Sequence, residues 1–309
     1  NDVRKTIDTW LATLGEVPTI EVAFYGGSFT GLDMDEQSSY LAVAKEYKHT
    51  GRIDKIHMST RPDYIDREIL DNLRAYSVDT IELGVQSFDD EVLRKSNRGH
   101  SAAIVYAAVE LIKEYGFELG IQLMIGLPGD SPESCIYSAE ETVKLAPSLA
   151  RLYPTIVIDD TELLEMYKRG EYEPLSREEA VTRTAAMYRI LDDAGITIMR
   201  VGLKSTDVIG EGGAINGGTY HPAFRQLVAT GLSLNSSQSQ EQLNLFLHIQ
   251  LHPIHQPNLS CQIPQLPFMR IHVSLLVPRW ISSRRRPGTR MRSAIRERTR
   301  SISTPNSRN

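Results

Sequence analysis

Over its first 200 residues the chain alternates between short apolar segments typical of strands and longer segments with helical periodicity. Strands are predicted at 20–25, 54–59, 78–84, 119–124, 151–158 and 196–201. Helices are predicted between them at about 35–48, 66–75, 101–115, 132–146 and 176–194. Strands connected through helices pair in parallel by right-handed crossovers. The pattern therefore fits two α/β folds, an open doubly wound sheet or a (βα) barrel, and both bind ligands at the carboxyl ends of the strands.

The composition is that of an ordinary globular protein, with 309 residues of which 41% are hydrophobic and 24% charged. No apolar run approaches the roughly 20 residues that cross a bilayer, and the first residues lack the apolar segment of a signal peptide. The two cysteines, Cys135 and Cys261, give neither a disulfide framework nor the spacing of a metal site. These features predict a cytoplasmic protein with no membrane partner.

The net charge of −5 is divided unevenly along the chain. Residues 1–231 contain 23 Lys and Arg against 37 Asp and Glu, whereas residues 232–309 contain 11 against 2. All eleven basic residues of the second part are Arg, and this part is rich in Gln, Ser, Pro and His. Such a step in composition marks a change of domain or of order. The sequence thus predicts a barrel domain over 1–230 and a separate tail over 231–309.

Two interpretations of the tail are open. It is either a basic disordered arm that binds nucleic acid, or a segment translated in a wrong reading frame, with the change near Thr230. The abrupt loss of Lys, Asp and Gly together with enrichment in Arg, Ser, Pro and His favours the second interpretation. The short apolar run from Ile271 to Val277 is expected to have no companion strand with which to form a sheet.

Four motifs stand at successive predicted strand ends. They are Gly26-Gly27-Ser28-Phe29-Thr30, Ser59-Thr60-Arg61-Pro62-Asp63, Gly84-Val85-Gln86-Ser87-Phe88-Asp89 and Gly126-Leu127-Pro128-Gly129. A Gly-Gly pair at a strand end lets backbone groups approach a ligand with no Cβ in the way. Each motif alone is more often a turn than a site, and Arg61 with Asp63 is expected to form a surface pair. Four such motifs at one sheet edge predict a ligand pocket.

The order and spacing of these motifs, together with Asn97-Arg98-Gly99-His100, resemble the radical S-adenosylmethionine (SAM) superfamily. The segments 150–157 and 170–176 narrow the resemblance to the subgroup related to the catalytic subunit of Elongator, which modifies tRNA wobble uridine. The resemblance covers residues 1 to about 228. It implies a partial (βα)6 TIM-like barrel, with the first βα unit missing from this chain.

The resemblance also implies cofactors and partners. In the family a Cys-x3-Cys-x2-Cys loop binds a [4Fe–4S] cluster, and one iron of that cluster chelates SAM. An electron donor such as flavodoxin or ferredoxin then drives cleavage of SAM to a 5′-deoxyadenosyl radical. The implied substrate is a tRNA base.

Carried over by position, the first motif and one arginine would hold the methionine part of SAM. Gly26, Gly27 and Ser28 would bind its ammonium group through carbonyl and hydroxyl acceptors. Arg98 would pair with its carboxylate, because the guanidinium fork matches a carboxylate.

The other strand ends would hold the nucleoside part. Ser59 occupies a position that contacts the ribose, and Gln86 would reach the ribose or the carboxylate. Gln122 stands where many relatives have Asp, at a ribose-binding position. Gly126 and Leu127 would line the adenine by backbone contact.

One departure from the family is the absence of the Cys-x3-Cys-x2-Cys motif. Cys135 lies in a predicted helix and is expected to be a buried, small apolar residue. The cluster ligands are expected upstream of Asn1, and this chain by itself is not expected to cleave SAM. The alternative is a cluster-free, degenerate barrel that binds a nucleotide or RNA. An ordinary metal-free barrel enzyme fits less well, because the strand ends offer no paired carboxylates and no nucleophile with a nearby His.

Overall fold

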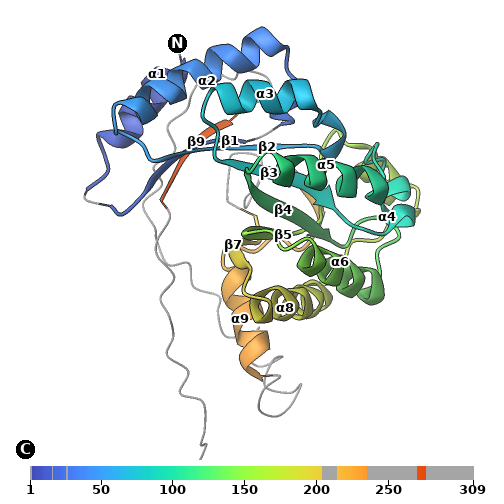
Figure 1. Cartoon of the computed structure of the whole chain (residues 1–309). Helices are drawn as coiled ribbons and strands as arrows, with labels where there is room; N and C mark the ends of the chain where they lie inside the picture. Colours follow the sequence, from blue (N-terminus) through green and yellow to red (C-terminus); the bar gives the residue numbers. More distant parts are fainter. Residues whose placement is uncertain (1, 16, 26, 204–213, 235–269, 276–309) are drawn as a thin grey trace, which may run out of the picture. The chain divides into compact units, whose positions relative to one another are not determined.

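A computed structural model of the chain describes residues 2–15, 17–25, 27–203, 214–234 and 270–275 (Figure 1). The chain divides into a unit of residues 1–276 and a second unit of residues 277–309, which lies outside the described residues. No helix in the described part of the chain is both long and apolar enough to span a membrane.

The first unit is built on one sheet of six parallel strands. They are β1 (Ile20–Tyr25), β2 (Lys55–Thr60), β3 (Thr80–Gln86), β4 (Glu118–Ile125), β5 (Leu149–Pro154) and β7 (Thr197–Val201). Their order across the sheet is β7-β5-β4-β3-β2-β1. The predicted strands are confirmed to within two residues, except that the segment predicted as 151–158 is divided into β5 and the short strand β6 (Ile156–Ile158).

Helices connect the strands. They are α1 (Asp2–Leu11), α2 (Met34–His49), α3 (Arg67–Ala75), α4 (Asp90–Lys95), α5 (Ala102–Glu114), α6 (Pro132–Lys144), α7 (Glu162–Lys168), α8 (Arg177–Asp193) and α9 (Phe224–Leu234), with 3-10 turns at Phe29–Gly31 and Pro62–Tyr64. Local sequence explains where several begin. The side chain of Asp89 accepts hydrogen bonds from the first turn of α4, and Ser176 forms a capping box with Glu179 at the start of α8.

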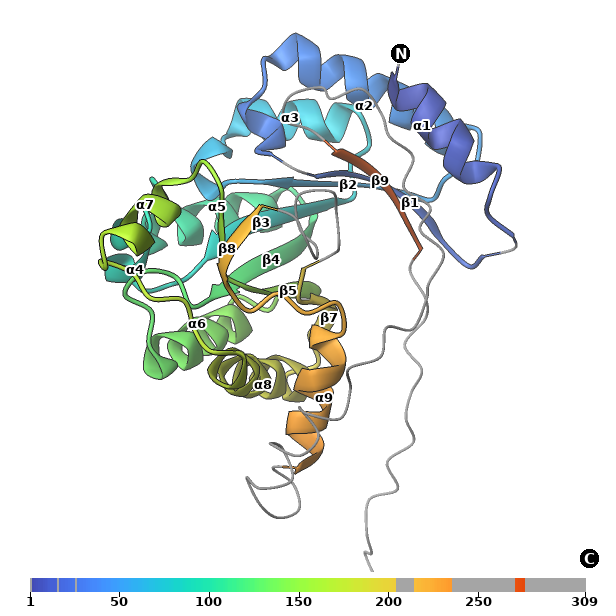
Figure 2. The same cartoon turned by 180° about the vertical axis from the view of Figure 1, so that it is seen from behind.

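The sheet is curled, and helices α2, α3, α5, α6 and α8 lie along its outer side (Figures 1 and 2). A doubly wound sheet has helices on both faces, whereas these helices lie on one side only. This arrangement identifies the fold as barrel-like and excludes the open doubly wound sheet. The six parallel strands form a half-barrel, which confirms the predicted fold class. A small antiparallel pair, β6 with β8 (Ile215–Gly218), follows β5.

The two faces of the sheet differ in polarity because side chains alternate along a strand. Apolar residues such as Phe24, Met58 and Leu83 are fully buried in the core shared with the helices. The alternating positions on the inner face carry polar residues, among them His57 and Glu82. The concave face is therefore polar, although its side chains are buried.

The expectation that the run 271–277 has no companion strand is wrong. Strand β9 (Arg270–Leu275) pairs antiparallel with β1, from Ile20 opposite Leu275 to Tyr25 opposite Arg270. The physical reason is that β1 ends the parallel sheet and leaves a row of backbone donors and acceptors that an extended segment can satisfy. The division at residue 230 stays a prediction.

Candidate ligand pocket at the strand ends

Most of the predicted site residues lie where the parallel strands end. They are Ser28 after β1, Ser59 on β2, Gln86 at the end of β3, and Gly126 and Leu127 after β4. Arg98 follows α4, whereas Gln122 lies further back, in the middle of β4. Gly27 is exposed beside Ser28, and Gly26 lies outside the described residues. The fold thus brings most of the predicted residues to one edge of the sheet.

Strand β3 ends in an unusual turn centred on Gln86. The backbone N–H of Ser87 donates to the carbonyl of Val85 at 2.9 Å, and Gln86 between them has φ of 71°. A three-residue turn with a positive φ at its centre is rare and strained, and such strain concentrates at functional sites. A Cβ on Gly84 would lie 2.8 Å from the Gln86 amide nitrogen, so the glycine leaves room for this side chain.

Replacing Gln86 with glycine tests this strain. We expect Gln86→Gly to raise the free energy of unfolding by about 1 kcal/mol, because glycine adopts positive φ without a steric penalty. Urea denaturation measures the change. The matched control is Gln226→Gly in α9, where the same substitution removes a helix former and lowers stability by about 0.5 kcal/mol. A loss of stability in both variants would contradict a strained turn.

Buried polar atoms without hydrogen-bond partners gather at this edge. Seven such side-chain atoms occur among the described residues, and four of them belong to Gln86 (Oε1), Arg98 (Nε), His100 (Nδ1) and Thr155 (Oγ1). Buried polar atoms in folded proteins are nearly always paired. Gln86 ends β3, Arg98 follows α4 and Thr155 follows β5. The unpartnered atoms of these three residues indicate a place where a bound molecule supplies the missing partners.

The same place has an excess of positive charge. Arg98 has no ion pair among the described residues, and its pKa is lowered by burial and by the nearby Arg61 guanidinium. Arg61 itself is bound by Asp63 through two hydrogen bonds of 2.9 and 2.7 Å, which confirms the predicted pair. An unpaired, half-buried guanidinium favours an anionic group such as a carboxylate.

The turn after β4 is closed by the chain itself. The N–H of Gly126 donates to Asp130 at 2.7 Å, and its carbonyl accepts from the hydroxyl of Tyr172 at 2.7 Å. A Cβ on Gly126 would lie 2.9 Å from the side chain of Leu175. The adenine contact at Gly126 and Leu127 therefore stays a prediction. An adenine there would make van der Waals contact with these residues and could donate to the second lone pair of the Gly126 carbonyl.

A buried ionic network on the concave face was not foreseen from the sequence. His57 lies between two carboxylates, with Nδ1 2.8 Å from Glu21 and Nε2 2.9 Å from Glu82. Arg151 Nε lies 2.7 Å from Glu82 and its guanidinium stacks on the ring of Tyr25. Gln122 lies near this network, because its amide is one of the groups that lower the pKa of Glu82. The one indication in the sequence was that charged or titratable residues recur at inward positions of successive strands, as Glu21, His57 and Glu82 do.

The network makes stability depend on pH. Burial opposes protonation of His57, but the hydrogen bonds to Glu21 and Glu82 outweigh it and raise the pKa of His57 to about 9 from 6.5. Because the folded-state pKa is raised, the stabilisation is complete below pH 6.5 and is lost as the pH rises through 9. We expect the free energy of unfolding to fall between pH 6.5 and 9.5. Urea denaturation across this range checks it, and a flat profile contradicts a protonated His57.

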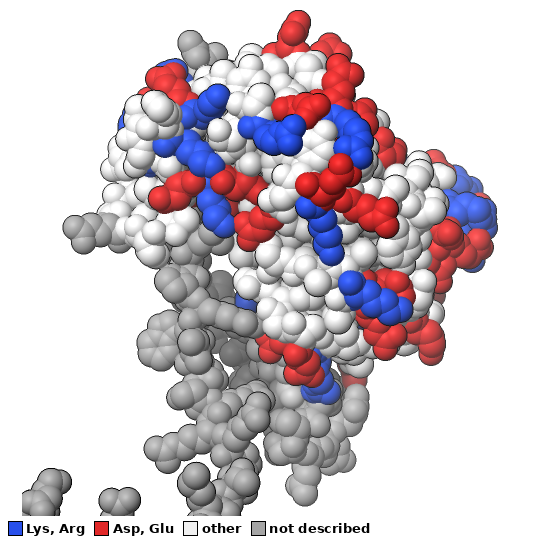
Figure 3. Space-filling model, in the orientation of Figure 1, with Lys and Arg blue, Asp and Glu red and all other residues white. Residues whose placement is uncertain are grey.

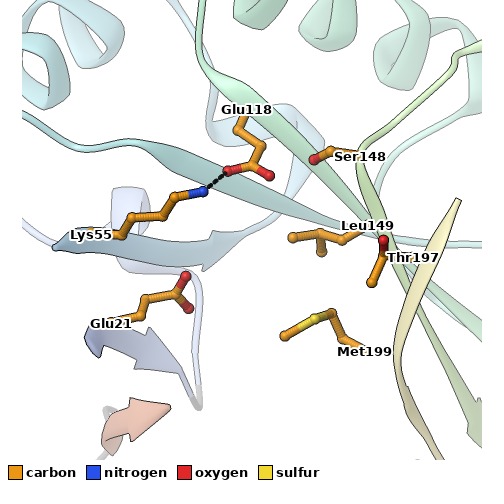
Figure 4. A pocket seen from close by; sticks show the side chains of 7 residues that line it. All are labelled: Glu21, Lys55, Glu118, Ser148, Leu149, Thr197 and Met199. Atoms are coloured by element: carbon orange, nitrogen blue, oxygen red, sulfur yellow. Dashed lines mark hydrogen bonds and ion pairs between the residues drawn. The ribbon is translucent and has the colours of Figure 1, made fainter. Parts of the chain in front are cut away.

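A cavity of about 140 Å³ lies at the opposite edge (Figure 4). Its lining includes the first residues of β2, β4, β5 and β7, which are Lys55, Glu118, Leu149 and Thr197. Lys55 and Glu118 pair across it at 2.8 Å. A space of this size holds a few water molecules, each of which takes about 30 Å³. The cavity lies away from the four motifs.

The described residues do not fit an iron–sulfur cluster. Within the ranges that the structure describes, no three His, Cys, Asp or Glu residues are grouped to hold a metal ion. Cys135 is 2% exposed in α6, which confirms its expected burial. Burial raises the pKa of its thiol, so it is not a ready thiolate ligand. Cys261 lies outside the described residues.

Two family models match the chain. The model of the Radical SAM superfamily covers residues 4–141, and that of the Radical_SAM C-terminal domain covers residues 147–233. The chain belongs to the radical SAM superfamily. The half-barrel is thus the fold of this superfamily, as the sequence predicted.

The relatives lie in the predicted Elongator-like subgroup. A tRNA uridine(34) acetyltransferase of Methanocaldococcus infernus is 31% identical over 182 residues, 52% of this chain and 34% of that protein. Elongator complex protein 3 of Homo sapiens is 31% identical over 178 residues, 53% of this chain and 32% of that protein. The chain thus spans about a third of the length of these two curated relatives. The solved structure of the archaeal Methanocaldococcus infernus Elp3 with an N-terminal deletion matches at a TM-score of 0.67 and 25% identity, over 76% of this chain and 59% of that one.

Proposed function

We propose that the pocket at the strand ends binds SAM. The observation that carries the proposal is the half-buried guanidinium of Arg98, whose Nε has no hydrogen-bond partner and which has no anionic partner among the residues that the structure describes. The methionine carboxylate of SAM is an anion of the right kind for this fork-shaped donor. The unpartnered Oε1 of Gln86 is an acceptor for a ribose hydroxyl.

Residues from the neighbouring strands complete the proposed pocket. Gly27 and Ser28, after β1, offer carbonyl and hydroxyl acceptors for the ammonium group of SAM. The hydroxyl of Ser59 lies on the inner face of β2, on the same side as His57, where it is a candidate contact for the ribose. Because the described residues do not fit a [4Fe–4S] cluster, the proposal is confined to binding SAM.

We further propose tRNA as the substrate class of the protein. This rests on the names of the two curated relatives, one a tRNA uridine(34) acetyltransferase and the other an Elongator protein. The alternative, a barrel that binds RNA without SAM, has less support from the surface. On the face shown in Figure 3, Lys and Arg side chains are interspersed with Asp and Glu. RNA-binding surfaces instead gather basic side chains in a patch or groove.

Isothermal titration calorimetry on the full chain distinguishes binding of SAM from binding of RNA without SAM. The probes are S-adenosylhomocysteine, which keeps the carboxylate and ribose of SAM, and adenosine, which lacks the amino-acid part. We expect saturable binding of S-adenosylhomocysteine and at least tenfold weaker binding of adenosine, since the charge-assisted contact to the carboxylate is lost. Equal affinity for the two probes would contradict the role of Arg98. Binding of tRNA without any binding of S-adenosylhomocysteine would favour the RNA-binding alternative.

A further inference from the structure

His100 lies close to Gln86 and Arg98, two residues of the proposed pocket, without being one of the predicted site residues. It is 7% exposed, just before α5, and its Nε2 is 3.2 Å from the backbone carbonyl of Val85. Its other ring nitrogen, Nδ1, is buried and has no hydrogen-bond partner among the described residues. A buried imidazole that donates its one hydrogen bond to a backbone carbonyl fixes the position of that carbonyl.

The carbonyl of Val85 is the one that closes the strained turn. It accepts from the N–H of Ser87 at 2.9 Å as well as facing His100, so both of its lone pairs are engaged. On the far side of the turn, Ser138 of α6 accepts from the N–H of Phe88 at 3.0 Å. A strained backbone persists only where its surroundings fix it. His100 and Ser138 are the two side chains that fix this turn from opposite ends.

We propose that His100 is a positioning residue for ligand binding, because it holds the Val85 carbonyl and thereby keeps Gln86 in the turn that presents its amide to the pocket. The proposal rests on the proposed function, since the pocket in question is the proposed SAM site. His100 acts through Gln86 and does not itself contact the ligand.

Burial keeps the ring of His100 neutral. Arg61, Arg98 and Asp63 are the charged groups that act on it, and Asp63 is already bound to Arg61. A second proton on the ring would sit on Nδ1, buried, without an acceptor and near two guanidinium groups. Burial lowers the pKa of His100 and outweighs the bond to Val85 and the charge of Asp63, which raise it, while Arg98 and Arg61 lower it further. The neutral form that donates from Nε2 therefore prevails at neutral pH.

Substitution of His100 by Gln or by Asn tests which ring nitrogen is needed. The nitrogen of Gln reaches about as far as Nε2 of histidine, whereas that of Asn reaches only about as far as Nδ1. With S-adenosylhomocysteine as the probe, we expect His100→Asn to raise the Kd by about tenfold, and His100→Gln to stay within about threefold of the unmodified chain. If His100→Asn does not unfold cooperatively, His100→Leu replaces it. Equal Kd values for the Asn and Gln variants would overturn the proposal.

A double-mutant cycle tests whether His100 acts through Gln86. In a Gln86→Ala background, the strained turn is retained but the amide is gone, so His100→Asn should change the Kd by less than about twofold. A loss of affinity as large as that in the unmodified chain means that His100 contacts the ligand directly, and this overturns the positioning role.

Hydrogen exchange gives a readout that needs no ligand. The amide of Ser87 is protected by its bond to the Val85 carbonyl, and we expect His100→Asn, but not His100→Gln, to speed its exchange by at least about tenfold. If the unmodified chain does not bind S-adenosylhomocysteine, the proposed function fails while this measurement still decides whether His100 holds the turn. Unchanged exchange in His100→Asn overturns the positioning role even where the pocket binds its ligand.

Discussion

Replacing Arg98 with alanine is expected to weaken the binding of S-adenosylhomocysteine by about 10- to 100-fold, because a hydrogen bond to a charged group contributes about 1.5–3 kcal/mol. The fold should not suffer. Among the described residues Arg98 has no ion pair, and its buried Nε has no hydrogen-bond partner. The side chain therefore lowers the stability of the folded state rather than raising it. Calorimetry gives the affinity and thermal unfolding gives the stability. Lost affinity with kept or increased stability is the pattern of a binding residue.

The control is Arg94→Ala, four residues earlier in α4. Arg94 is exposed and pairs with Glu91 at 2.7 Å, one helical turn away. Its removal changes the net charge by the same amount but leaves the pocket alone, so the affinity should stay unchanged. If Arg94→Ala weakens binding as much as Arg98→Ala does, the effect is one of overall charge and Arg98 has no special role.

The second large effect is expected at Glu82. Its carboxylate is fully buried between His57 and Arg151, at 2.9 and 2.7 Å. Burial would raise the pKa of Glu82, but the hydrogen bond from His57 and the charge of Arg151 hold it below the usual value. Glu82→Ala leaves two buried cationic groups without this anion. We therefore expect it to lower the free energy of unfolding by about 3–5 kcal/mol, measured by urea denaturation.

A solvent-exposed carboxylate serves as the comparison for Glu82. Glu91 also pairs with an arginine, but both side chains are more than half exposed. Exposed ion pairs contribute little because water screens them. Glu91→Ala should thus leave the unfolding curve nearly unchanged. Should the two variants unfold at the same urea concentration, the network on the concave face does not hold the strands together.

Much of the architecture followed from local pattern. Short apolar segments predicted the parallel strands, and helical periodicity predicted helices between them. The choice between an open sheet and a half-barrel did not follow, because curvature is a property of strands packed together. The pairing of 270–275 with β1 was missed for a similar reason. The edge it covers comes from a segment about 250 residues earlier in the chain.

The candidate site was foreseen in part. Gln86 was singled out because it belongs to a strand-end motif, and Arg98 because it belongs to the motif that follows it in a recognisable order. Their contacts with a ligand stay predictions. The network of Glu21, His57 and Glu82 was missed because its members come from three strands, and each alone looks like an ordinary polar residue. His100 belongs to the motif Asn97-Arg98-Gly99-His100, but its proposed role depends on its contact with the Val85 carbonyl. That contact cannot be predicted from sequence spacing.

The most direct test of the account is a crystal structure of the full chain with S-adenosylhomocysteine. We expect the ligand at the carboxyl ends of β1 to β4, with its carboxylate bound to Arg98 and the turn at Gln86 unchanged. A ligand bound at the opposite edge, beside Lys55 and Glu118, or one that leaves Arg98 without a contact, would contradict it.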